Sequence, residues 1–244
     1  MLRGRGTVSR RATGWALLIL SLTSTSVRAG YVLQPRSGGK GFGQTKSATQ
    51  PPSFHVRLAT ARDIPAIRNC NVANLPENYS DDFYKRHLLL WPRLAIVAEV
   101  NDAIVGYTLG RVDTQPSTRT STSNIPDIGN YSPPQTIGHV ASIAVYKEFR
   151  KLGVAKALMN MLHEQMGSEL DSPVDTVSLH CRVSNEQAIR LYSGYFPYQC
   201  ISIVPSYYAD NEDAWLMRLA NLQTYLAGRK GLESVVGGSA LQQI

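Results

Sequence analysis

A short basic turn between two apolar segments carries residue types that bind phosphate groups. The turn contains Arg150, Lys151 and Gly153, after an apolar run that ends at Val145 and before a periodic segment that begins at Val154. Backbone N–H groups in such a turn point toward one place, and the N-terminus of the following helix adds partial positive charge. The glycine lets a phosphate approach the backbone closely. A basic turn can also be an ordinary solvated feature, so it is a candidate pyrophosphate site that needs further support.

Two histidines and one carboxylate are candidates for proton transfer. His139 and His180 lie in segments predicted as strands, and Glu77 lies in a segment predicted as a loop. Imidazole and carboxylate groups can accept a proton directly or through a water molecule. A single histidine on a strand is often a structural residue, and a loop carboxylate is often a solvated surface group. The residue types alone do not choose among the three.

The elements that would position these groups alternate between strands and helices from Phe54 onward, which is typical of an α/β layer fold. Strands are predicted at His55–Ala59, Ala95–Val100, Ile104–Val112, Ile137–Val145, Thr176–Arg182, Cys200–Val204 and Asp213–Leu219. Helices are predicted at Arg62–Val72, Asp82–Leu90, Gly153–Met166 and Asn185–Tyr192. Asn101-Asp102 predicts a hairpin turn. The segment 113–136 is rich in Ser, Thr and Pro and longer than most loops, which predicts a functional or disordered role.

The formal net charge of +7 comes from the first 53 residues. They hold eight of the 25 Lys and Arg residues and no Asp or Glu, which leaves 17 basic and 18 acidic residues in 54–244. The nearly neutral domain gives no reason to expect direct nucleic-acid binding. The three cysteines, Cys70, Cys181 and Cys200, are odd in number and lack a CxxC spacing. They therefore indicate neither a disulfide framework nor a zinc site, and no metal is expected.

Residues 1–53 are predicted to be a targeting extension that is removed or disordered. A basic stretch precedes the apolar run 15–22, and Val27-Arg28-Ala29 has the small-x-small pattern of a signal-peptide cleavage site. Residues 30–53 are also free of acidic residues and have transit-peptide composition. This layout favours an organellar leader, either ER-routed or plastid. The alternatives are a mitochondrial presequence, a retained anchor or a wrongly assigned start. No stable membrane span is expected, because the apolar run is too short.

The segment 226–244 is predicted to be a disordered tail, since it contains four glycines and little periodicity. One catalytic domain is therefore expected over 54–225.

Four blocks of sequence resemble one enzyme family. Arg150-x-x-Gly153-x-Ala155, between a strand and a helix, is similar to the acetyl-CoA pyrophosphate motif of the GNAT superfamily. Leu75–Tyr79, Val177–Asn185 and Tyr207–Ala214 resemble blocks in the catalytic subunits of NatA-type N-terminal acetyltransferases, with similar spacing over most of 54–220. The resemblance implies the GNAT fold, a mixed central β-sheet flanked by helices. It also implies transfer of an acetyl group from acetyl-CoA to the α-amino group of protein N-termini, with small first residues (Ser, Ala, Thr or Gly).

The resemblance also implies a role for individual residues. The acetyl-CoA site is expected to include Ile143, Ala144, Val145, Arg150, Lys151, Gly153, Val154, Ala155, Asn185 and Tyr192. The peptide site is expected to include Leu75, Pro76, Glu77, Tyr79, Arg182, Tyr207 and Tyr208. The expected catalytic residues are Glu77 as first candidate for the base, His180 and His139 as alternatives, and Tyr192 at the CoA thiolate. A backbone N–H in Ile143–Val145 would bind the oxyanion. Asn185 and Tyr192 are also compatible with a helix cap and a packing aromatic, and Arg182 would attract an acidic first residue.

The partners implied by the resemblance are protein or nascent-chain N-termini, an auxiliary scaffold subunit and the ribosome. A cytoplasmic complex at the ribosome is therefore the alternative to an organellar location. Two other functions remain open: a GNAT enzyme that acetylates lysine side chains or small amines, and an inactive GNAT-fold binding module. Gly194–Tyr198 and the long 113–136 loop depart from the family pattern at the rim of the expected cleft.

Overall fold

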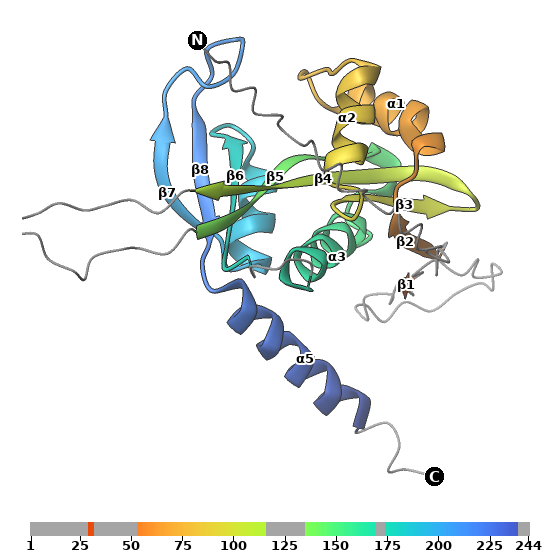
Figure 1. Cartoon of the computed structure of the whole chain (residues 1–244), viewed down its shortest axis with the longest axis vertical. Coiled ribbons are helices and arrows are strands. Elements are labelled where there is room, and N and C mark those ends of the chain that lie inside the picture. Colours follow the sequence, from red (N-terminus) through yellow and green to blue (C-terminus); the bar gives the residue numbers. More distant parts are fainter. Residues whose placement is uncertain (1–28, 32–52, 116–134, 169–173, 239–244) are drawn as a thin grey trace, which may run out of the picture.

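One mixed β-sheet forms the frame of the protein (Figure 1). The computed structural model describes residues 29–31, 53–115, 135–168 and 174–238. Within these residues the strand order is β1-β2-β3-β4-β5-β6-β8-β7, and all neighbours are antiparallel except β5 and β6, which are parallel. The strands are β1 (Ala29–Tyr31), β2 (Phe54–Leu58), β3 (Ala95–Val100), β4 (Ala103–Gln115), β5 (Gln135–Val145), β6 (Thr176–Arg182), β7 (Gln199–Val204) and β8 (Ala214–Leu219). The prediction of a mixed central sheet is confirmed.

Helices cover both faces of the sheet, with α1 and α2 on one face and α3 on the other (Figure 1). The helices are α1 (Ile64–Asn74), α2 (Asp81–Leu90), α3 (Val154–Ser168), α4 (Glu186–Ile189) with a π-helix (Arg190–Tyr195) directly after it, and α5 (Leu222–Gly238). On β4, Tyr107 and Leu109 pack in the core cluster under α1 and α2. Gly110 allows α3 to approach the opposite face, because a Cβ atom there would lie 2.7 Å from Leu162 Cδ1.

Local hydrogen bonds hold the turn before α1 and fix where α2 begins. The Asp63 carboxylate, just before α1, accepts bonds from the Thr60 N–H at 2.7 Å and from Arg57 of β2 at 2.8 and 2.9 Å. Ser80 precedes α2, and its side chain accepts a bond from the Phe83 N–H at 3.4 Å. An N-terminal cap such as that of Ser80 stabilises a helix by about 1 kcal/mol. The Ser80 cap lies at the end of the loop between α1 and α2, which carries Glu77.

Strands β5 and β6 separate part of the way along the sheet. Their pairing ends at Val140 of β5 and Leu179 of β6. On the other side of β5, the register against β4 shifts next to Ala141. Beyond Val140, the edge of β5 that faces β6 therefore has no ladder partner, and unpaired backbone groups need another partner. This is where a ligand can enter the sheet.

Two segments differ from the prediction. Helix α5 continues to Gly238, where disorder was expected from residue 226. Leu222 and Leu226 are buried, and a Cβ atom at Gly167 of α3 would overlap the Leu226 side chain, so a small residue on α3 lets α5 pack closely. β1 lies inside the predicted targeting extension and pairs with β2. Residues 1–28, 32–52 and 239–244 lie outside the described part.

The 113–136 loop is shorter than predicted, because β4 runs to Gln115 and β5 begins at Gln135. Residues 116–134 lie outside the described part. No helix in the described ranges is long and apolar enough to cross a membrane.

Candidate active site

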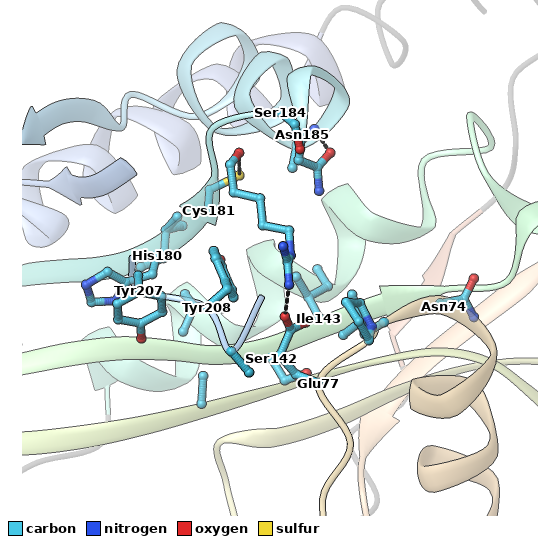
Figure 2. A pocket seen from close by; sticks show the side chains of 18 of the residues that line it. Asn74, Glu77, Ser142, Ile143, His180, Cys181, Ser184, Asn185, Tyr207 and Tyr208 are labelled. Atoms are coloured by element: carbon cyan, nitrogen blue, oxygen red, sulfur yellow. Dashed lines mark hydrogen bonds and ion pairs between the residues drawn. The ribbon is translucent and has the colours of Figure 1, made fainter. Parts of the chain in front are cut away.

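The separation of β5 and β6 opens into a pocket of about 760 Å³. Its walls come from β5, β6, the loop between α1 and α2, the segment around α4 and the loop between β7 and β8. Figure 2 shows Glu77, Ile143, His180, Tyr207 and Tyr208 around this space. Of the predicted site residues, the pocket brings together Leu75, Pro76, Glu77, Tyr79, His139, Ile143, His180, Arg182, Asn185, Tyr192, Tyr207 and Tyr208.

The remaining predicted residues do not line this pocket. Ala144 and Val145 are buried in the two core clusters on either side of β5. Arg150, Lys151, Gly153, Val154 and Ala155 form the turn beyond the end of β5 and the start of α3. The predicted site residues therefore fall into two main groups. One group lines the pocket, where β5 contributes residues from His139 to Ile143, and the other forms the turn after the end of β5.

Arg182 is the centre of a charged cluster that joins two walls of the pocket. It donates hydrogen bonds to Glu77 at 2.5 Å, to Glu212 at 2.6 Å and to Asp210 at 2.8 Å, and its guanidinium lies 4.0 Å from the centre of the Tyr208 ring. Figure 2 marks the contact at Glu77 with a dashed line. Burial would lower the pKa of Arg182, but the hydrogen bonds to Glu212, Glu77 and Asp210 outweigh it and raise the pKa.

The charge balance of this cluster favours a cationic ligand. Hydrogen bonds from Ser184 and Arg182 lower the pKa of Glu212 to about 2, and Arg182 lowers the pKa of Asp210. Three carboxylates surround one guanidinium, so the cluster carries net negative charge at neutral pH. It suits an ammonium group better than a carboxylate. Arg182 is thus not an unpaired cation ready to attract an acidic first residue.

The two histidines lie side by side in the pocket and are neutral at neutral pH. Their ring centres are 5.5 Å apart, and the His180 ring stacks on Tyr207 at 4.2 Å. His139 Nδ1 lies 3.0 Å from the Ser178 hydroxyl oxygen. Desolvation, with a contribution from Arg111, lowers the pKa of His139 to about 4 and also lowers the pKa of His180. Both rings can accept a proton, but as weak bases.

Tyr192 and Asn185 lie at the α4 side of the pocket. Tyr192 belongs to the π-helix and is 6% exposed, and burial raises the pKa of its hydroxyl. The hydroxyl therefore stays protonated at neutral pH and can donate to a thiolate. Asn185 caps α4, because its Oδ1 accepts a bond from the Ala188 N–H at 3.1 Å. Asn185 lines the pocket as well, so the two interpretations of this residue are compatible.

Arg150 holds the basic turn in place, and the turn is open to solvent at Gly153. Arg150 donates to the Val145 carbonyl at 3.0 Å and to the Asn74 side chain at 2.6 Å, so its guanidinium ties the turn to β5 and α1. Gly153 has φ of +87°, and no atom lies within 4 Å of the place where its Cβ would be. An open left-handed glycine directly before α3 leaves the first N–H groups of that helix available to an anion.

Several residues that line the pocket, such as Ser142 and Asp210, or that support it were not singled out in the sequence. Asp210 and Glu212 lie in the Tyr207–Ala214 block, and their acidic character was the available signal. Ser142 is held at 2.7 Å from the Tyr107 hydroxyl, which also accepts a bond from Asn71 at 2.8 Å. No signal in the sequence joins these three residues, because they come from separate elements.

Within the described ranges, no group of three or more metal-binding side chains is close enough to hold an ion.

Comparison with known proteins gives a consistent class of enzyme. The acetyltransferase (GNAT) family matches residues 64–195. The NAA10 catalytic subunit of the N-terminal acetyltransferase A complex of Arabidopsis thaliana is 38% identical over 164 residues, which cover 67% of this chain and 76% of that protein. An N-alpha-acetyltransferase of Sulfolobus acidocaldarius is 34% identical over 173 residues, which cover 71% of this chain and 96% of that protein. The solved structure of Arabidopsis thaliana NAA60 in complex with acetyl-CoA has a TM-score of 0.56 at 19% identity and covers 68% of this chain and 99% of that one.

The chain therefore belongs to the acetyltransferase (GNAT) family. Within that family it is an N-alpha-acetyltransferase, an enzyme that acetylates protein N-termini. This confirms the expected fold, family and reaction class. The roles of individual residues and the choice of first residue stay predictions.

Proposed function

We propose that this enzyme takes its acetyl group from acetyl-CoA and transfers it to the α-amino group of polypeptides with small first residues. The observation that carries the proposal is the arrangement along β5. An open anion-binding turn lies at Gly153, beyond the end of the strand, and a net negative cluster around Arg182 lies in the pocket beside it. A phosphate-bearing thioester and a cationic amine can then meet at the unpaired edge of β5. The related fold of NAA60 holds acetyl-CoA, which supports this donor.

The pocket residues supply the proton transfers that the reaction needs. An α-amine has a pKa of about 7.7–8.0 and must lose a proton before its nitrogen attacks the thioester carbonyl carbon. Glu77 accepts this proton directly or through water, with His180 and His139 as alternatives. A backbone N–H in Ile143–Val145 holds the oxyanion. When the C–S bond breaks, the departing thiolate takes a proton from the Tyr192 hydroxyl, and the proton released by the attacking amine returns to Tyr192 through water.

Small first residues are expected to be acetylated faster than methionine. Leu75–Tyr79 and Tyr207–Tyr208 line the pocket from two sides, and overfilling a packed site costs about 1–3 kcal/mol, which is roughly tenfold or more in rate. Competition between Ser-, Met- and Glu-starting peptides with the same remaining sequence measures this selectivity. A peptide with a blocked N-terminus and one internal lysine is the control for side-chain acetylation. A clear preference for Met would place the enzyme in another substrate class.

Glu77→Gln is expected to reduce turnover about 10²-fold while acetyl-CoA affinity is retained, because the amide keeps the shape of the side chain but cannot accept the proton. The measurement is kcat and KM from about pH 5 to pH 9, with acetyl-CoA binding measured separately. Full activity of the variant across this range would return the role to a histidine. With His139 as base, the rate would fall only as pH drops toward its pKa of about 4, since the neutral ring is required.

We further propose that the enzyme works with an auxiliary scaffold subunit that carries it to the ribosome. The Arabidopsis relative is the catalytic subunit of a complex, and Val72, Leu89 and Leu90 of α1 and α2 are exposed by 57%, 81% and 55%. Leu89→Glu should prevent copurification of such a subunit and leave the isolated enzyme active on short peptides.

Residues 1–53 support an alternative proposal, an organellar location, because of their basic, acid-free composition. Imaging fusions of residues 1–53 and of the whole chain to a fluorescent protein decides between the two locations.

A further inference from the structure

Four polar side chains form a row across the open face of the sheet. Cross-strand pairing places Arg111 of β4 opposite His139 of β5, His139 beside Ser178 of β6, and Ser178 opposite Arg218 of β8. Residues paired in this way share one face of a sheet. The contact of 3.0 Å between His139 Nδ1 and the Ser178 hydroxyl agrees with this arrangement. With strands about 4.8 Å apart, the two arginines are separated by about 14 Å.

This face continues beyond the cover of α1 and α2. Tyr107 and Leu109, which precede Arg111 on the same face of β4, are buried in the core cluster that includes those helices. Arg111 has 44% of its side chain exposed, and Arg218 is also exposed. Neither Arg111 nor Arg218 belongs to a core cluster, and among the described residues no helix contributes to a core cluster over this end of the face. The opposite face of the same strands packs against α3.

The row borders the pocket and carries the opposite charge. His139 lines the pocket. Desolvation is the main cause that lowers the pKa of His139 and of His180, and the nearby charge of Arg111 is the second cause. Arg111 donates to Asp113 at 3.1 Å, and Arg218 makes no ion pair with the residues that the structure describes. Two arginines against one aspartate leave the row positive, next to the net negative cluster around Arg182.

The distance between the row and the reacting atoms determines which residues of an acceptor polypeptide can contact the row. The amine must lie near Ile143, and His139 is four residues earlier on β5, about 13 Å away at 3.3 Å per residue. An extended polypeptide covers this distance in about four residues. The side chains that reach the row are therefore those of the third to fifth residues.

We infer that Arg111, His139, Ser178 and Arg218 form a downstream subsite that binds acidic side chains at positions three to five of the acceptor polypeptide. The inference rests on the proposed function, because it takes the acceptor to be an N-terminus in the pocket. Arginine binds carboxylates through parallel N–H donors, and the hydroxyl of Ser178 and the ring of His139 add hydrogen-bonding groups between the two cations. The enzyme thus accepts a cationic amine and a following acidic stretch in one orientation.

The test uses the full chain and Ser-starting peptides that differ only at positions three to five, with Glu, Gln or Lys there. The measured quantity is the ratio of kcat/KM between the Glu and Gln peptides, which is expected to be about two- to fivefold, as for exposed charge pairs. Arg111→Gln and Arg218→Gln should each reduce the ratio, and the double variant should bring it near one. Arg218→Glu should shift the preference toward the Lys peptide. Raised salt should also reduce the ratio.

Arg190→Gln is the matched control, because Arg190 is an exposed arginine whose ion pair among the described residues is with Glu186 of α4, and the ratio of this variant should stay at the wild-type value. Acetylation of Glu and Gln peptides at equal kcat/KM overturns the subsite while the proposed function stands. A preference that persists in the double variant overturns it as well. If no Ser-starting peptide is acetylated at all, the proposed function fails first.

Discussion

Gly153→Glu is expected to weaken acetyl-CoA binding by at least about tenfold, or ~1.4 kcal/mol. The φ of +87° is a conformation that residues with a Cβ atom rarely adopt, and the side chain would occupy space that is open at present. Its carboxylate would also face the diphosphate, and two like charges about 4 Å apart repel by about 1 kcal/mol in water and more near a protein surface. The measurement is calorimetric titration of the variant with acetyl-CoA.

Gly153→Ala separates the two causes. It introduces the same backbone strain, but its methyl group meets no atom within 4 Å and carries no charge. It should therefore lose less affinity than the glutamate variant, and the difference between them should shrink at high salt. Thermal unfolding shows whether either variant is still folded. Unchanged acetyl-CoA affinity in a folded Gly153→Glu variant would remove the turn from the donor site.

The parts of the fold that the sequence predicts best are those set by local pattern. The strands Ala95–Val100 and Thr176–Arg182 have the bounds that were predicted, and Asn101 and Asp102 adopt the positive φ of a tight hairpin turn. Helix α5 was missed because its glycines lower helix propensity, while the contact of Leu226 with α3 that holds it is remote in sequence. Tertiary packing outweighs local propensity there.

The candidate site divides in the same way. Many of the residues that line the pocket were identified through three short blocks that resemble a family, Leu75–Tyr79, Val177–Asn185 and Tyr207–Ala214, and each block is continuous in sequence. The separation of β5 and β6 depends on long-range register, so no single segment encodes it. The same is true of the row from Arg111 to Arg218, whose members come from four strands. Charges brought together by topology are not visible in a linear sequence.

Arg182 is the clearest case of charges brought together by topology, because its three carboxylate partners come from two separate loops. Its replacement should have the largest effect on catalysis. Arg182→Met is expected to reduce kcat/KM by at least about 10²-fold, since removing one partner of a hydrogen-bonded charge cluster leaves the others unpaired. Glu77 would repel Glu212 and Asp210, and the loop before α2 would lose its link to the loop between β7 and β8. Methionine keeps much of the apolar length of the side chain. Steady-state kinetics with a Ser-starting peptide measures the loss.

Controls distinguish the position of Glu77 from general damage. Arg182→Lys keeps the charge but not the planar fork that reaches several carboxylates and stacks on Tyr208, so its activity should lie between wild type and Arg182→Met. Acetyl-CoA affinity should be retained in both variants, because the donor turn is a separate element. Adding Glu212→Gln to Arg182→Met should restore part of the activity if charge repulsion is the cause. Wild-type turnover of a folded Arg182→Met enzyme would show that the acceptor site does not depend on this cluster.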